Sequence, residues 1–274
     1  MHNGLIGLSG GLDSTVSSYV TATAMQQSIN LERISEANLT LVNFRGLENL
    51  DTKLIARDLQ ERFPSVNVQY HELDIREEIR RTNCFIKTLT DRLGLNCIEV
   101  PGEIIPRLIS SILNEIGDRK GYATIDSTNG TEFVLGEFTT GIRYDIALLS
   151  DLFKSSVFAV GELLRIPEFV LNAKPVNSAF SFTDKLSLYF GKVPEDITPK
   201  DAYGVLDPVL YWIYEKKKSP KKIADILGHS EEFVKRIKKR IRNQKYRRKT
   251  PIFLARSRRL YFPNTTDISD LESK

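Results

Sequence analysis

The sequence predicts an α/β protein with a doubly wound parallel sheet, helices on both faces of the sheet and a helical C-terminal portion. Short apolar or alternating runs of strand length occur at residues 4–8, 39–44 and 66–73, and helical patterns at 14–25 and 51–63 separate them. Strands joined through helices pair in parallel. A glycine-containing turn follows the first strand, which is where ligands bind in such sheets.

The remaining elements follow in order along the chain. After the third strand, helical periodicity predicts helices at 76–92 and 104–116, and residues 122–126 predict another strand before a polar turn. A helix is expected at 150–164, ending before Pro167. Residues 180–199 have no consistent period and contain Gly191 and Pro194, so they predict a mobile loop that would serve as a lid. Further helices are expected at 205–217, 220–227 and 231–241.

Length and composition fit one main domain. Of the 274 residues, we expect 1–260 to form a single domain and 261–274 a flexible acidic tail. No apolar run approaches the roughly 20 residues that span a bilayer, and the start lacks a signal-peptide pattern, so a cytoplasmic location and no membrane partner are expected. Cys84 and Cys97 have neither metal-ligand nor redox-pair spacing.

Positive charge is concentrated towards the C-terminus. The net charge is +4, and Lys and Arg are dense from Lys216 to Arg259. Such a run forms either a solvated helix face or a polyanion-binding surface. Residues 221–241 resemble a helix-turn-helix with Gly228 at the turn, but no base-reading pattern accompanies it, so nucleic acid is not the expected partner.

The turn after the first strand predicts a phosphate-binding loop. Backbone N–H groups and the helix dipole at such a turn attract an anion. The hydroxyl groups of Ser9, Ser14 and Thr15 add donors, and the spacing of a lysine-containing kinase-type loop is absent. Asp13 would repel a bound phosphate unless a divalent cation lay between them, so we expect a Mg²⁺ ligand there.

A second polar segment follows the strand at 122–126. Residues 127–140 carry Glu132, whose carboxylate would complete a magnesium site with Asp13. The alternative role of Glu132 is to stabilise the N-terminus of a helix through its dipole.

These segments together resemble the ammonia-dependent NAD synthetases, a family of N-type ATP pyrophosphatases. The SGGxDS loop of that class matches residues 9–14. The likeness runs along nearly the whole chain, and the other family motifs match residues 127–132, 136–139, 145–154, 164–167, 203–207 and 245–251. The family pattern is shortened by two residues at 140–145, its PSADL segment is replaced at 177–180, and Tyr246 stands where the family has histidine.

The resemblance implies an adenine nucleotide α-hydrolase-like fold and a two-step amide synthesis. ATP would adenylate the carboxylate of deamido-NAD, releasing pyrophosphate, and free ammonia or ammonia from a separate donor protein would displace AMP to give NAD. The family is homodimeric, and the helix at 104–116 is expected to be buried in the dimer. Asp13 and Lys154 are the implied catalytic residues, and Asp13 and Glu132 the implied Mg²⁺ ligands.

The resemblance also implies binding residues for both substrates. The ATP-binding residues are Ser9, Gly10, Gly11, Asp13, Ser14, Asn43, Arg45, Ser127, Lys154 and Ser178. The acceptor-binding residues are Arg107, Phe138, Thr139, Arg143, Asp145, Lys245 and Arg247. Arg143 has the alternative of being an ordinary surface arginine.

Two other functions stay open at this point. An N-type ATP pyrophosphatase could adenylate another carboxylate or a tRNA base, for which the basic C-terminal run is the main support. The second open function is that of a nucleotide-binding homologue without catalytic activity. Its support is that the acceptor segment departs most from the family pattern.

Overall fold

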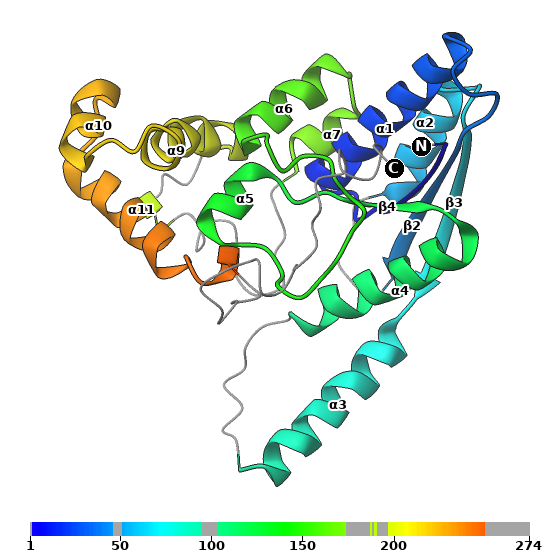
Figure 1. Cartoon of the computed structure of the whole chain (residues 1–274), viewed down its shortest axis with the longest axis horizontal. Coiled ribbons are helices and arrows are strands. Elements are labelled where there is room, and N and C mark those ends of the chain that lie inside the picture. Colours follow the sequence, from blue (N-terminus) through cyan, green and yellow to red (C-terminus); the bar gives the residue numbers. More distant parts are fainter. Residues whose placement is uncertain are drawn as a thin grey trace, which may run out of the picture.

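The computed structural model describes residues 2–45, 51–94, 103–173, 187, 189–190 and 197–249. Within these residues a five-stranded sheet has the order β3-β2-β1-β4-β5, and every neighbouring pair is parallel (Figure 1). The strands are β1 (Asn3–Gly7), β2 (Asn38–Arg45), β3 (Asn67–Asp74), β4 (Ala123–Asp126) and β5 (Ile146–Ala147). The predicted doubly wound parallel sheet is confirmed.

Strand order reverses between β1 and β4. Ile6 of β1 pairs with Leu41 of β2 on one side and with Ile125 of β4 on the other. The chain winds outwards from β1 to β2 and β3, and then returns to β4 beside β1. The carboxyl ends of β1 and β4 are therefore adjacent, at the point where doubly wound sheets bind ligands.

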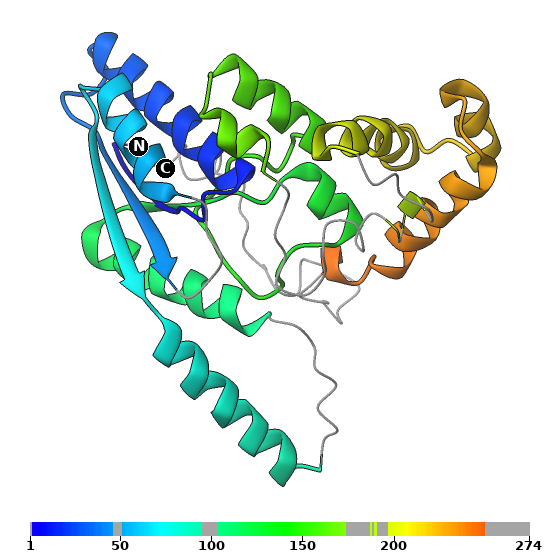
Figure 2. The same cartoon turned by 180° about the vertical axis from the view of Figure 1, so that it is seen from behind.

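Helices cover both faces of this sheet (Figures 1 and 2). The larger core contains Ile6 and side chains of α1 (Leu12–Asn30), α2 (Thr52–Arg62) and α6 (Lys154–Leu163). On the other face Leu5 packs in a smaller cluster with Leu113 of α4 (Ile104–Lys120). Successive side chains of β1 thus point to opposite cores, as strand geometry requires.

The C-terminal helices form a layer beyond the sheet, next to α6 (Figure 1). They are α9 (Pro199–Tyr214), α10 (Pro220–Leu227), α11 (Glu231–Asn243) and the 3₁₀ turn η1 (Arg247–Lys249). Thr198, Ser219 and Ser230 cap the three α-helices by accepting N–H donors of the first turn. Gly228 ends α10 in the left-handed conformation, at φ 69°. The predicted bounds of α10 are confirmed.

Several predicted boundaries were wrong. Helix α6 begins at Lys154 instead of residue 150, because the preceding residues form turns. Helix α9 spans Pro199–Tyr214 instead of residues 205–217. The short elements β5, α5 (Gly130–Leu135) and α7 (Glu168–Leu171) were not predicted. Helices α2 and α3 (Arg76–Arg92) agree with prediction within one residue at each end.

Part of the predicted lid at 180–199 is not an exposed loop. Ser187, Tyr189 and Phe190 are helical, Tyr189 is buried, and the Phe190 ring stacks on Phe233 with 5.2 Å between centroids. Residues 180–186, 188 and 191–196 lie outside the described residues, as do Cys97 and the acidic tail at 261–274. Among the helices that the structure describes, none combines the length and apolarity needed to cross a membrane.

Two helical glycines give a matched test of the packing of α4. A Cβ atom at Gly117 would lie 2.9 Å from the carbonyl oxygen of Tyr122, whereas one at Gly204 in α9 would meet no atom within 4 Å. We expect Gly117→Ala to lower the free energy of unfolding by about 1–3 kcal/mol through overpacking. Gly204→Ala should raise it by about 0.5–1 kcal/mol, because alanine favours a helix. Urea unfolding of both variants measures the difference, and a stabilised Gly117→Ala would contradict the packing described.

Candidate active site

The phosphate loop (residues 9–14) connects β1 to α1. Gly10 has φ 84°, a conformation that favours glycine, and Gly11 is the N-cap of α1 without a side-chain cap. Inside the loop the Ser9 and Ser14 hydroxyl oxygens are 3.0 Å apart, and the Gly11 N–H donates to Ser9 Oγ at 3.3 Å. The first-turn N–H groups of α1 therefore have no capping side chain of their own, which suits an anion.

Asp13 lies in the first turn of α1 and is held from two directions. Its Oδ2 pairs with the ammonium of Lys154, the first residue of α6, and its Oδ1 accepts a hydrogen bond of 3.0 Å from Asn129 Nδ2. Lys154 is buried, which alone would lower its pKa, but the negative charges of Asp13 and Glu132 outweigh burial and raise the pKa of this ammonium. Lys154 is therefore positively charged at neutral pH.

Asn129 joins the two predicted carboxylates. It is the N-cap of α5, its side chain accepts the Glu132 N–H at 3.0 Å, and its own N–H donates to Glu132 Oε2 at 3.3 Å. In this capping box Glu132 has the alternative role considered above, which is to stabilise the N-terminus of a helix. The same asparagine also contacts Asp13, so Asp13, Asn129 and Glu132 converge between the ends of β1 and β4.

Asp207 of α9 holds the elements that carry these groups. Its carboxylate accepts hydrogen bonds of 2.7 Å from Thr131 Oγ1 of α5 and from the Ser155 N–H of α6. Thr131 Oγ1 in turn accepts the Lys154 N–H at 2.8 Å. Burial raises the pKa of Asp207, and these donors counteract that rise. Three helices are thereby fixed around the Lys154 side chain.

A further carboxylate, Asp126, ends β4 beside the phosphate loop. Its Oδ1 accepts from the Thr128 N–H at 3.1 Å and the Thr128 hydroxyl at 3.0 Å. Burial raises the pKa of Asp126, and the negative charge of Asp13 adds to the effect. Asp126, Asn129, Tyr203 and Asp207 were not predicted as site residues, although the last three lie inside matched motifs. The Tyr203 ring centroid is 6.0 Å from Lys154 Nζ.

The other predicted ATP-binding residues make structural contacts. Asn43 Nδ2 donates to the Leu8 carbonyl at 2.9 Å, which ties β2 to the start of the loop. Arg45 pairs with Glu72 of β3. Ser127 is partly buried in the turn after β4, and Ser178 lies outside the described residues.

Two of the predicted acceptor-binding residues share one carboxylate. Arg107 of α4 and Arg247 of η1 both pair with Glu103. Arg247 also donates to the Phe138 carbonyl, and its guanidinium carbon is 5.9 Å from the Phe138 ring centroid. Arg107 Nε donates to the Thr140 carbonyl at 2.9 Å. Glu103 was not predicted, and it brings α4, η1 and the segment after α5 together.

The remaining acceptor predictions lie in different surroundings. Arg143 has an exposed side chain, and its carbonyl accepts from Asn114 Nδ2 at 2.7 Å. The Asp145 carboxylate accepts from the Thr124 N–H at 2.8 Å and the Thr124 hydroxyl at 2.9 Å, and these donors lower its pKa. Asp145 thus fastens the segment before β5 to β4. Thr139 is partly exposed, and Lys245 is exposed after α11.

The donor set is compatible with Mg²⁺. Asp13 and Glu132 offer carboxylate oxygens, which this ion prefers. Among the described residues, no group of three or more His, Cys, Asp or Glu side chains could hold a metal. Mg²⁺ is usually bound through one or two carboxylates together with water and substrate phosphates.

A phosphate loop at the reversal point of a parallel sheet, facing carboxylates from the next strand, defines a nucleotide-binding α/β protein. Comparison with known families narrows this class. The sequence profile of the family described as NAD synthase matches residues 2–251, and the chain belongs to that family.

Curated relatives carry the name NH(3)-dependent NAD(+) synthetase. The protein of Pyrococcus furiosus is 26% identical over 250 residues, which cover 90% of this chain and 86% of the relative. The protein of Thermoplasma acidophilum is 28% identical over 221 residues, 78% of each chain.

Solved structures share the fold. The NH3-dependent NAD synthetase from Campylobacter jejuni superposes with a TM-score of 0.61 at 16% identity, covering 93% of this chain and 90% of the other. The NMN synthetase from Francisella tularensis gives a TM-score of 0.60 at 20% identity, with coverage of 92% and 90%. The adenine nucleotide α-hydrolase-like fold expected from the resemblance is confirmed.

The Asp13–Lys154 pair predicts a specific pattern of stability. Lys154→Met should lower the free energy of unfolding by about 3–5 kcal/mol, because it leaves the Asp13 carboxylate without its cation. The double variant Asp13→Asn with Lys154→Met should lower the free energy of unfolding by less, because it leaves no unpaired charge at these two positions. Lys200→Met, which removes an exposed pair with Glu162, serves as the control and should cost at most about 1 kcal/mol.

The pH dependence of this effect follows from the raised pKa of Lys154. A raised pKa means that the stabilisation is fully present below the unfolded value of 10.5 and is lost as the pH rises through the folded value. The difference between wild type and Lys154→Met should therefore stay constant from neutral pH up to 10.5. Chemical denaturation across this range measures it. A rise between pH 7 and 9 would refute a charged Lys154, because it would mean that the folded protein loses this proton before the unfolded chain does.

Proposed function

We propose that the chain catalyses the ATP-dependent amidation of deamido-NAD with ammonia, giving NAD, AMP and pyrophosphate. The observation that carries this proposal is the convergence of Asp13, Asn129 and Glu132 on the phosphate loop, in a chain of the NAD synthase family. Relatives that cover most of the chain bear the name of this activity. The enzyme is then a ligase that forms a carbon–nitrogen bond.

The chain's own groups suit the first step of this reaction. The acceptor carboxylate attacks the α-phosphorus of ATP, and pyrophosphate leaves with additional negative charge. Loop N–H groups and the Lys154 ammonium lie where they can stabilise that charge. Asp13 and Glu132 would hold Mg²⁺, which would neutralise the phosphates. Ammonia then attacks the acyl carbon of the adenylate, displacing AMP, so no covalent bond to the protein is needed.

The acceptor is assigned to the side of the site that carries Arg107 and Arg247. A dinucleotide brings two phosphate charges, and guanidinium groups recognise phosphate through paired N–H donors. Both arginines are positioned by Glu103, and the Phe138 ring lies next to Arg247. Arg143, which is exposed, remains a candidate for the same ligand.

A homodimer is part of this proposal. No residue of α3 is buried in the single chain, and its apolar side chains Phe85, Ile86, Leu89 and Leu93 are 37–68% exposed. Their spacing places them along one side of the helix, as expected for a surface that packs on a second copy. Helix α4, expected in the dimer, already buries Ser110, Leu113 and Gly117 within the chain, so only its opposite face is available.

The nitrogen source and the location are assigned only from the sequence. Free ammonia, or ammonia from a separate protein, would be the donor. The expected cytoplasmic location also stays a prediction.

Pyrophosphate release across a panel of acceptors tests the function. With ATP, Mg²⁺ and ammonium, we expect turnover with deamido-NAD and none with unrelated carboxylates or tRNA. Asp13→Asn should reduce turnover by at least roughly 100-fold, because it removes charge stabilisation of several kcal/mol. Asp118→Asn, an exposed position on α4, is the matched control and should be unaffected. Absence of turnover with deamido-NAD at any ammonium concentration would refute the function.

Two arginines of α4 test the acceptor site. Arg107 forms an i,i+4 ion pair with Glu103, the N-cap of α4, and Arg119 forms one with Glu115. Only Arg107 reaches the segment after α5. Arg107→Ala should raise the KM for deamido-NAD about 10- to 150-fold, the value of one charge-assisted contact, with little change in that for ATP. Arg119→Ala should change neither constant. Equal effects on both KM values would show that Arg107 is not part of the acceptor site.

A further inference from the structure

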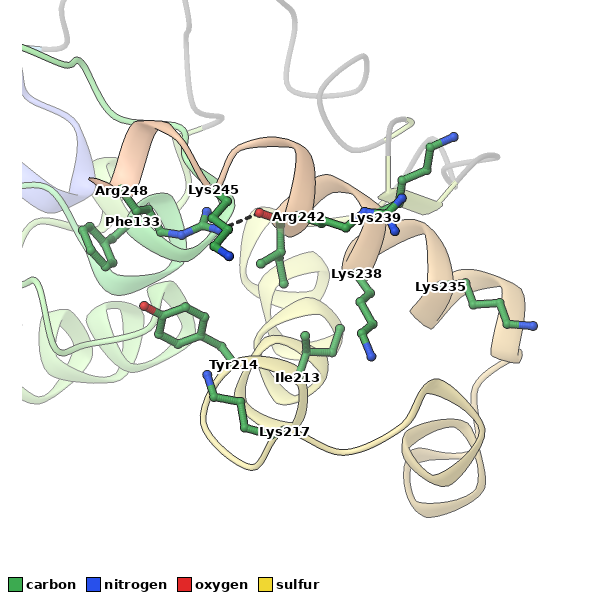
Figure 3. Close-up of a pocket in the computed structure, with 11 residues that line it drawn as sticks. Phe133, Ile213, Tyr214, Lys217, Lys235, Lys238, Lys239, Arg242, Lys245 and Arg248 are labelled. Carbon is green, nitrogen blue, oxygen red and sulfur yellow. Dashed lines mark hydrogen bonds between the residues drawn. The ribbon is translucent and has the colours of Figure 1, made fainter. Parts of the chain in front are cut away.

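A second concave site lies between α9, α11 and η1. Its volume is about 650 Å³, which is within the range of pockets for small molecules. None of its eleven lining residues belongs to the phosphate loop or to the Asp13–Lys154 pair. Seven of them are Lys or Arg and none is acidic. Figure 3 shows these side chains along α11 and, across the pocket, on α9 and the residues after it.

Most of this positive charge is not compensated. Lys235 pairs with Glu231 at 2.9 Å, and Arg248 donates to the carbonyl oxygens of Val134 and Ile241. The other five are Lys217, Lys238, Lys239, Arg242 and Lys245. In the part of the chain that the structure describes, none of these five forms an ion pair with a carboxylate. Like charges that face one pocket repel each other, and a bound polyanion would remove that repulsion.

One end of the pocket is aromatic. Phe133 is 37% exposed although its ring stacks on Phe138 at 5.6 Å, and Figure 3 shows it and Tyr214 at the end opposite Lys235. Lys217 Nζ lies 4.4 Å from the Tyr214 ring centroid. An aromatic ring beside a row of cations suits a planar base followed by phosphates.

The end of α9 places Lys217 at the rim of the pocket. Its φ is 53°, a left-handed conformation that residues other than glycine rarely adopt, and this conformation places it after the end of α9 at the rim of the pocket. Glu32 and Arg165 have the same conformation just after the ends of α1 and α6, so at all three positions it accompanies the end of a helix. The row from Lys235 to Arg242 spans eight helical residues, a rise of about 11 Å, which is the scale of a single nucleotide with its phosphates.

We propose that this pocket is a second nucleotide-binding site, which takes a nucleoside polyphosphate with its base against Phe133 and its phosphates along the cations of α11. The site is separate from the phosphate loop, and Lys245 is the one predicted acceptor-binding residue among its lining residues. Helix α5 connects the two, because Glu132 belongs to the Asp13 site and Phe133 lines this pocket.

Calorimetric titration with α,β-methylene ATP, which cannot be cleaved at the α-phosphate, tests the proposal. We expect two equivalents to bind per wild-type chain. The variant Lys238→Glu with Arg242→Glu should bind one, since reversing two exposed charges weakens the second site by at least about 100-fold. The control Lys221→Glu with Lys222→Glu makes the same charge change on exposed α10 positions outside the pocket and should still bind two.

Two further measurements identify the ligand class. Inorganic tripolyphosphate should bind the pocket more weakly than the nucleotide analogue, and Phe133→Ala should remove that difference. Deamido-NAD and a ten-nucleotide single-stranded RNA serve as competitors, and neither should displace the second equivalent.

Several outcomes would overturn the proposal. A single equivalent bound by the wild type, or equal loss in both charge-reversal variants, would mean that no second site exists. Displacement by deamido-NAD would make the pocket part of the acceptor site, and pocket-dependent RNA binding tighter than that of the analogue would make it a nucleic-acid surface.

Discussion

The reversal of strand order between β1 and β4 is the constraint on which the site depends. Two adjacent parallel strands end at the same edge, where β1 leads into α1 and β4 leads into the turn before α5. The N-terminus of α1 and the cap of α5 therefore lie next to each other. Asp13 and Asn129, which are 116 residues apart in the sequence, form a hydrogen bond there.

The ion-pair and hydrogen-bond partners of Asp13 then determine how the side chains of this site are arranged. A carboxylate at the N-terminus of a helix is favourable, but Asp13 is largely buried and needs a partner. Lys154 supplies it, and the position of Lys154 depends on Thr131 and Asp207. The capping box of Asn129 and Glu132 serves the structure of α5 and also presents a second carboxylate to the loop. Capping of α5 uses Asn129 Oδ1 and Glu132 Oε2, whereas Asn129 Nδ2 donates to Asp13.

The sequence predicted those parts of the fold that have strong local signals. The apolar run before the loop located β1, and Ser219, Pro220 and Gly228 mark both ends of α10. The two residues of β5 are too few to give a period, and their pairing depends on the contact between Asp145 and Thr124.

The site residues that have strong local signals were predicted as well. Asp13 and Glu132 could be expected together because each follows a strand of one parallel sheet. The three-residue spacing of Asn129 and Glu132 is that of a capping box and could have been recognised in the sequence. The contacts of Asn129 with Asp13, of Asp207 with Thr131 and of Glu103 with Arg247 join distant elements, and no spacing along the chain reveals them. Tyr189 lies in a segment without periodicity, yet it is buried by tertiary packing.

The hydrogen bonds around Lys154 also constrain the order in which the chain can acquire its final form. Thr131 and Asp207 are separated by 76 residues, and Asp13 and Lys154 by 141. During synthesis β1, β2 and β3 leave the ribosome well before α9, so the half of the sheet that carries the loop can pair first. Asp13 then has no ion-pair partner until Lys154 of α6 has been synthesised. Helix α6 in turn lacks its hydrogen bond to Asp207 until α9 has been synthesised. We expect the reactive centre to be the last part of the described chain to become ordered, after most of its sheet has formed.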